Sequence, residues 1–102
     1  MLVLRPTCEH CRRPQPPAST DAMICTYDST FCRHCVADVL GNVCPNCGGG
    51  FVPRPVRPAT EWRPGVSLAH QPASPEVVHK PVDAAGQAAL RARVGDTPPE
   101  RR

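Results

Sequence analysis

The residues best suited to chemistry are seven cysteines, all of which lie between positions 8 and 47 of a 102-residue chain. Six of them form the Cys-x-x-Cys pairs Cys8/Cys11, Cys32/Cys35 and Cys44/Cys47, and Cys25 stands alone. A Cys-x-x-Cys pair lets two thiolates bind one tetrahedral ion, and two such pairs complete a closed zinc site. Three pairs and a single cysteine therefore predict two metal sites, one of which lacks a ligand.

Metal binding is a better expectation for these cysteines than disulfide bonding. The apolar residues 1–4 are followed by Arg5-Pro6, which is too short for a signal-peptide core of about 7–15 residues. No apolar run approaches the roughly 20 residues of a membrane span, so we expect no membrane association. We expect a cytoplasmic protein, because clustered cysteines in a reducing compartment more often bind metal. We predict two zinc ions, although iron also accepts four thiolates.

The spacing favours an interleaved arrangement of the two sites. The pairs Cys8/Cys11 and Cys32/Cys35 would share one ion, and Cys44/Cys47 would share the second ion with Cys25. This is the cross-brace order of RING fingers. A zinc ribbon is the alternative, in which the first pair joins the last and leaves Cys25, Cys32 and Cys35 for another ion.

The second site needs one more ligand from the segment between Cys25 and Cys32. The cross-brace pattern places it at position 29, which is serine, and a neutral hydroxyl is a poor zinc ligand beside thiolates. We predict that Asp28 supplies the ligand, because Cys25-x-x-Asp28 has the spacing of a zinc knuckle and carboxylates bind zinc. The alternatives are water, His34, Ser29, His10 or a distant histidine.

Short elements must position these cysteines. Strands are predicted over residues 22–25 and 29–32, on either side of a turn at Tyr27-Asp28. A short helix is predicted over residues 35–40, and Gly41-Asn42 ends it. The predicted fold is a small metal-stabilised α+β module over residues 1–52, of the RING-like cross-brace or treble-clef type.

The composition changes after the last cysteine pair. Residues 53–82 are rich in proline and arginine, and residues 51–58 should be extended, close to polyproline II. We expect residues 59–82 to lie over the module or stay mobile, with Trp62 packed against it. In the last segment, residues 83–102, Asp83 could cap a short helix over 84–94 that Gly95 ends. Residues 97–102 should be disordered.

Several stretches are informative together: residues 1–11, Thr30-Phe31-Cys32, and residues 43–50 followed by Phe51-Val52-Pro53-Arg54-Pro55. They resemble a family of small bacterial cysteine-rich proteins that is known only as a domain of unknown function. The resemblance covers about residues 1–80 and implies a zinc-binding protein with no established activity. It also implies a cysteine at the position of Ser29, where this chain departs from the family.

The distribution of charge along the chain bears on whether the partner is a protein or a nucleic acid. The first 50 residues carry four arginines and four acidic residues, so the net charge of +3 comes from the remainder. We expect a non-enzymatic zinc-binding module that mediates protein interaction, because no Glu or His is placed as a general base. One alternative is a metal- or redox-responsive protein that uses the incomplete second site. The other is a nucleic-acid-binding zinc finger, with a basic stripe of Arg5, Arg12, Arg13, Arg33, Arg54 and Arg57.

Overall fold

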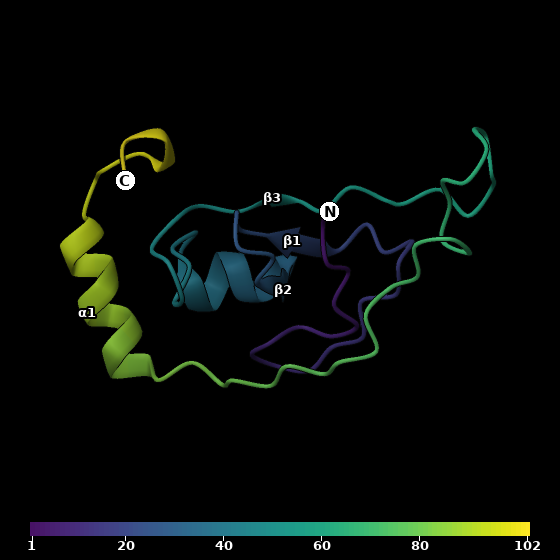
Figure 1. Ribbon diagram of the computed structural model, residues 1–102. Helices are drawn as coiled ribbons and strands as arrows, with labels where there is room; N and C mark the ends of the chain where they lie inside the picture. Colours follow the sequence, from purple (N-terminus) through teal and green to yellow (C-terminus); the bar gives the residue numbers. More distant parts are fainter.

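The centre of the molecule is the antiparallel hairpin that the sequence predicts, as the computed structural model of residues 1–102 shows (Figure 1). Strand β1 (Ala22–Ile24) pairs with β2 (Thr30–Cys32), and Ala22 lies opposite Cys32. Cys25 directly follows β1, whereas Cys32 ends β2. The two cysteines therefore lie at opposite ends of the hairpin, about 10 Å apart at about 3.3 Å per residue. One ion cannot bind both.

A third strand was not predicted. Strand β3 (Val52–Pro53) pairs antiparallel with β1, which gives the sheet order β2-β1-β3. The sequence around it indicated polyproline II, because prolines recur and no alternation of polar and apolar residues is present. An edge strand of two residues tolerates Pro53, which has no N–H to donate to a neighbour.

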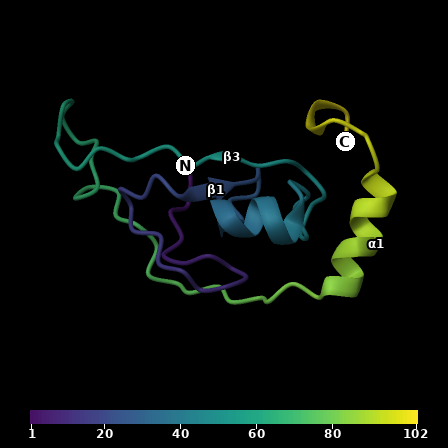
Figure 2. The ribbon, with the colours of Figure 1, turned by 180° about the vertical axis from the view of Figure 1, so that it is seen from behind.

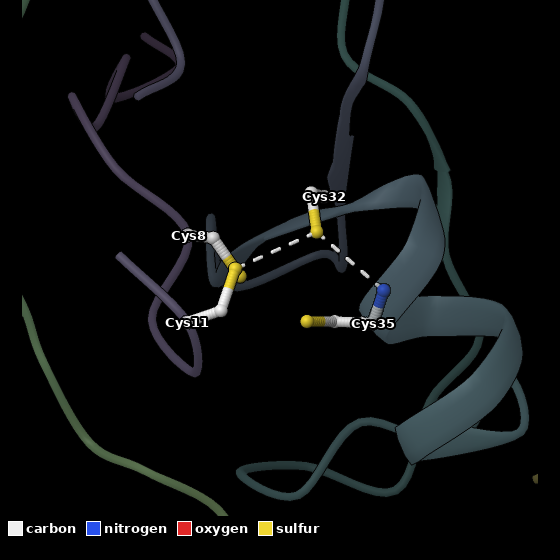
Figure 3. Close-up of side chains that lie close together, drawn as sticks. All are labelled: Cys8, Cys11, Cys32 and Cys35. Carbon is white, nitrogen blue, oxygen red and sulfur yellow. Dashed lines mark hydrogen bonds between the residues drawn. The ribbon is translucent and has the colours of Figure 1, made fainter. Parts of the chain in front are cut away.

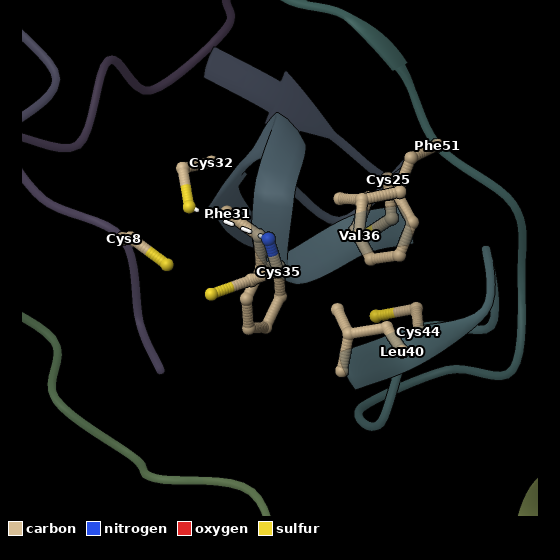
Figure 4. Packing of buried hydrophobic residues seen from close by; sticks show 9 residues of the cluster. All are labelled: Cys8, Cys25, Phe31, Cys32, Cys35, Val36, Leu40, Cys44 and Phe51. Carbon is tan, nitrogen blue, oxygen red and sulfur yellow. Dashed lines mark hydrogen bonds between the residues drawn. The ribbon is translucent and has the colours of Figure 1, made fainter. Parts of the chain in front are cut away.

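The predicted helix over residues 35–40 is confirmed as the short helical segment η1 (Cys35–Leu40), which has π-helical geometry. It ends at Gly41, whose φ of 59° is left-handed and whose N–H donates to the carbonyl of Val36. Val36 and Leu40 are buried. They pack with Phe31 and Phe51, whose rings meet edge to face with centroids 5.4 Å apart (Figure 4).

The buried cluster around these four residues also includes five of the seven cysteines: Cys8, Cys25, Cys32, Cys35 and Cys44. Its apolar part is small, and so short a core rarely stabilises a fold without a disulfide or a metal. The stability of the module therefore depends on what joins the cysteines.

After β3, residues 54–102 run around this centre as an open belt (Figures 1 and 2). It leaves β3, projects near residues 60–70 and returns past the N-terminal segment. There the N–H of Ser74 donates to the carbonyl of Leu4 at 3.0 Å, and that of Lys80 donates to the carbonyl of Glu9 at 2.9 Å. The belt gives the molecule its flat, elongated shape of 47 × 27 × 17 Å.

The helix predicted over residues 84–94 is confirmed as α1 (Ala84–Val94). The Asp83 carboxylate accepts a hydrogen bond from the N–H of Gly86, and Gly95 follows the last turn. One face of α1 is fixed to the module by Gln87, whose side-chain amide donates to the carbonyls of Leu40 and Val43 at 3.1 and 2.8 Å. No helix of the structure has the length and apolar character needed to cross a membrane.

Two expectations for the tail differ from the structure. Residues 97–102 were expected to be disordered, but they contain the turn η2 (Pro99–Arg101), and Arg102 donates to the carbonyl of Asn42 at 2.7 Å. The prediction that Trp62 packs on the module is wrong, because its side chain is 79% exposed. It belongs to the projecting segment, which is closed by its own hydrogen bonds rather than by packing.

Candidate metal centres

The first cluster consists of four cysteines whose sulfur atoms all lie within 4.8 Å of one another: Cys8, Cys11, Cys32 and Cys35 (Figure 3). The first two come from the N-terminal knuckle, and the others come from the end of β2 and the start of η1. The sulfurs of Cys11 and Cys32 are 3.8 Å apart. A tetrahedral site with Zn–S bonds of about 2.3 Å requires sulfurs about 3.8 Å apart. The donor set and spacing therefore fit a zinc ion.

Burial and mutual proximity disfavour the thiolate form of the cysteines in this cluster when no cation is bound. Cys8, Cys32 and Cys35 are almost completely buried, and Cys11 is exposed. Burial raises the pKa of Cys32 and that of Cys35, because a thiolate loses its hydration there and the neighbouring sulfurs compete for charge. All seven cysteines are free of disulfide bonds. Four thiolates packed this closely repel one another unless a cation neutralises them.

The second cluster joins Cys25 at the end of β1 to Cys44 and Cys47 from the knuckle after η1, again with sulfurs within 4.8 Å of one another. Cys25 and Cys44 are buried, whereas Cys47 is exposed. Burial raises the pKa of Cys44 to about 12. Backbone N–H groups of Tyr27 and Gly49 donate to the sulfurs of Cys25 and Cys47 at 3.3 and 3.4 Å. This cluster offers three thiolates and no fourth.

The knuckles at Cys8 and Cys44 share one backbone geometry. In each, the residue after the second cysteine is left-handed and donates its N–H to the carbonyl of the first cysteine, Arg12 to Cys8 at 3.0 Å and Gly48 to Cys44 at 2.8 Å. This turn brings the two sulfurs of a pair to the same side. The structure thus brings together the groups of cysteines in the interleaved order, not in the order of a zinc ribbon.

The structure does not bring the carboxylate of Asp28 to the second cluster. Asp28 itself is the left-handed residue of its turn, with φ of 63°, and its N–H donates to the carbonyl of Cys25 at 3.2 Å. In the two knuckles the left-handed residue, Arg12 or Gly48, directly follows the second cysteine ligand. The hairpin turn is one residue shorter than a knuckle, so Asp28 occupies the position after a ligand and not the position of a ligand. Its carboxylate instead accepts a hydrogen bond from the N–H of Val3 at 3.3 Å.

The two histidines considered for this position also lie elsewhere. His10 accepts a hydrogen bond at Nδ1 from the N–H of Val82 at 2.9 Å, which fixes the belt to the first knuckle. His34 pairs with Asp38 on the exposed side of η1, with Nδ1 and Oδ2 2.8 Å apart. Neither ring belongs to the cluster of sulfurs.

Ser29 is the side chain that does lie beside the second cluster. It is 6% exposed, and the Asn46 amide donates to its Oγ at 3.0 Å. Burial works against ionisation of Cys25, but hydrogen bonds from Ser29 and Tyr27 bring its pKa below the usual thiol value. The hydroxyl thus stands where the resemblance implies a cysteine.

A buried carboxylate completes this arrangement. Glu9 is 3% exposed; its Oε2 accepts from the N–H of Thr30 at 2.8 Å and its Oε1 from the Asn46 amide at 3.3 Å. Glu9 and Asn46 lie between the two cysteines of the first and last Cys-x-x-Cys pairs, and the sequence contains no signal that they would meet. Through them the two knuckles and the hairpin share one hydrogen-bond network.

Comparison with known proteins identifies relatives of this chain. The family model described as "Protein of unknown function (DUF1272)" matches residues 1–57, which include every cysteine. The uncharacterized protein R02474 of Rhizobium meliloti (strain 1021) is 54% identical over 81 residues, which cover 79% of this chain and 89% of that protein. No solved structure matches the chain. The family match and this relative show that the chain belongs to the DUF1272 family of cysteine-rich proteins, whose function is unknown.

Proposed function

We propose that this protein is a non-enzymatic zinc-binding module with a RING-like cross-brace, in which the two cysteine clusters bind two zinc ions, zinc stabilises the fold and the belt presents a surface to a protein partner. The observation that carries the proposal is the first cluster, where four sulfurs converge within 4.8 Å of one another and one pair lies 3.8 Å apart, the separation in a tetrahedral zinc site. The small apolar core is the reason to expect that the module needs zinc, since metal binding contributes directly to the free energy of folding.

Native mass spectrometry tests the zinc proposal. Protein produced with zinc should carry two zinc ions. The Cys35→Ser variant should lose the ion of the first cluster and most of its folded structure, whereas the matched variant Ser74→Ala, a serine outside both clusters, should retain both ions. A protein that carries no metal, or iron in place of zinc, would contradict the proposal.

The exposed tryptophan supports a protein partner. Trp62 lies in a loop that is closed by the hydrogen bond from the N–H of Leu68 to the carbonyl of Pro58 at 2.9 Å. Within it, the N–H of Gly65 donates to the Glu61 carboxylate at 2.8 Å. A tryptophan held outward on an ordered loop is typical of interface hot spots, where Trp is enriched.

One arginine of the basic stripe considered for nucleic-acid binding is not available to a phosphate. Arg54 is 4% exposed and donates to three backbone carbonyls, so its guanidinium cannot reach a phosphate.

Photo-crosslinking from position 62 in producing cells tests for a protein partner. A discrete protein adduct is expected from position 62 and not from Ala89, an exposed position on α1. Adducts that are the same from both positions would count against the loop as the binding surface.

A further inference from the structure

The second cluster differs from the first at a single corner, where Ser29 replaces a fourth thiolate. The four-cysteine site presents a sulfur at every corner of a tetrahedron, but Cys25, Cys44 and Cys47 occupy only three. Neither a carboxylate nor an imidazole belongs to the cluster, since Asp28, His10 and His34 are engaged elsewhere. What Ser29 does there decides the chemistry of this site.

The hydrogen bonds around Asn46 define the role of the Ser29 hydroxyl. The Asn46 amide oxygen accepts from the ammonium of Lys80 at 3.3 Å, and its nitrogen faces the Glu9 carboxylate. A carboxylate can only accept and an ammonium can only donate, so these two neighbours fix which end of the amide faces Ser29. Asn46 therefore donates to Ser29 Oγ, and the serine must accept at that contact.

The Ser29 hydroxyl is thus held beside the second cluster, because Asn46 lies between Cys44 and Cys47 in the sequence. A serine hydroxyl that accepts a hydrogen bond from an amide is a neutral group with part of its acceptor capacity already used. A neutral hydroxyl competes poorly with water for an ion that three thiolates already hold.

The second cluster is also open to small molecules. Cys47 is exposed, and a hollow of about 510 Å³ that includes Cys47, Tyr27, Phe51 and Arg102 in its lining lies beside it. A smaller hollow of about 290 Å³ reaches the buried Cys25. A ligand from solvent can thus approach the cluster without unfolding the module.

We propose that the second site holds zinc with three thiolates and one exchangeable ligand from solvent, so that it releases and takes up zinc while the first site keeps the fold. In this arrangement Ser29 accepts a hydrogen bond from Asn46 and is not a metal ligand. The proposal rests on the proposed function, because both require two bound zinc ions. It gives the two sites different roles, a structural ion and an exchangeable one.

Zinc release to a chromogenic chelator tests the exchange. The two-zinc protein should release its metal in two phases of equal amplitude, with the fast phase at least about tenfold faster, as expected when the shell around a metal is incomplete. Ser29→Cys should slow the fast phase by at least about tenfold. The control Ser74→Cys adds a thiol away from both clusters and should leave both phases as they are.

A second measurement probes the open corner directly. In the cobalt-loaded protein, added imidazole should shift the visible absorption bands of one of the two cobalt ions. It should do so in the wild type and in Ser74→Cys, but not in Ser29→Cys. Two ions that leave in one phase, or a wild-type spectrum that imidazole does not change, would overturn the exchangeable site and leave the zinc module standing. A protein with fewer than two zinc ions would instead overturn the proposed function.

Discussion

Replacing Gln87 with alanine should detach α1 from the module while the module itself stays folded. Gln87 is 5% exposed, and it is the only residue of α1 that is buried. Its amide donates to the carbonyls of Leu40 and Val43. Leu40 is the last residue of η1, and Val43 precedes the knuckle at Cys44. In the variant the Val43 carbonyl loses this partner and the Leu40 carbonyl keeps only the N–H of Val43, and no other side chain of α1 donates to either carbonyl.

The size of the effect follows from these two hydrogen bonds. Each contributes about 1 kcal/mol net, so their loss lowers the free energy of opening of α1 by about 2 kcal/mol. That corresponds to an increase of roughly 30-fold in the population of the undocked helix. The helix has too few residues to persist alone, since isolated helices shorter than about 12–15 residues are marginal in water.

Hydrogen exchange measures this opening. Amides of α1 should exchange roughly 30-fold faster in Gln87→Ala, while those of β1 keep the wild-type rate. The matched control is Ala88→Gly, which weakens the helix by about 1 kcal/mol at an exposed position without touching the two carbonyls. Unchanged exchange of α1 in Gln87→Ala would refute the reasoning, because it would show that other contacts hold the helix. Faster exchange of β1 would show that the helix is part of the same folding unit as the sheet.

Three further predictions concern the module. Phe31→Ala, at a side chain 1% exposed, should lower the free energy of unfolding in the presence of zinc by about 3–5 kcal/mol, as judged by urea unfolding; a loss below 1 kcal/mol would contradict its place in the core. Arg54→Met keeps the apolar stem but removes the donors to three carbonyls, so it should cost at least about 2 kcal/mol in the same assay, against about 0.5 kcal/mol or less for the exposed Arg63→Met. Excess chelator should unfold the zinc-loaded protein, which circular dichroism would show; a spectrum that stays folded without metal would contradict the role of zinc in stability.

Local signals made the cysteine groups and the C-terminal helix predictable. The cysteine spacing indicated the interleaved order because it matches the cross-brace of RING fingers, and the structure gives the physical reason, since the hairpin places Cys25 and Cys32 at opposite ends. The helix over residues 84–94 has a capping aspartate before it and a glycine after it, and both act within one turn of the chain. Signals of this kind depend on neighbours in sequence, so a single sequence contains them.

The position of Asp28 shows where such reasoning ends. The spacing Cys25-x-x-Asp28 matches a knuckle, but the spacing does not specify whether the turn closes after four residues or five. The hydrogen bond from the N–H of Cys25 to the carbonyl of Ser29, at 3.3 Å, closes it one residue early and turns the Asp28 carboxylate away. The roles of Glu9, Asn46 and Gln87 were hidden for a different reason. Each binds a group distant in sequence, and no local pattern marks the two partners.

The excess of arginine and proline has a structural explanation that the sequence interpretation did not give. The chain has 14 prolines, none of which has a backbone N–H, so it contains more carbonyl acceptors than amide donors. An arginine side chain carries five N–H donors in a fixed fork and can satisfy several carbonyls at once. Long side chains can therefore take the place of the missing backbone amides.

Three arginines of the belt act in this way. Arg54 donates to the carbonyls of Arg5, Gln15 and Pro16, and Arg57 to those of Leu2 and Gln71. Arg102 reaches the carbonyls of Thr97, Asn42 and Gly48. These bonds join the N-terminal segment, the belt and the last knuckle across regions with almost no regular secondary structure. In this protein proline-rich chain and arginine side chains are complementary, since one removes backbone donors and the other restores them. The positive charge of the belt is thus partly committed to holding the chain around its two cysteine clusters.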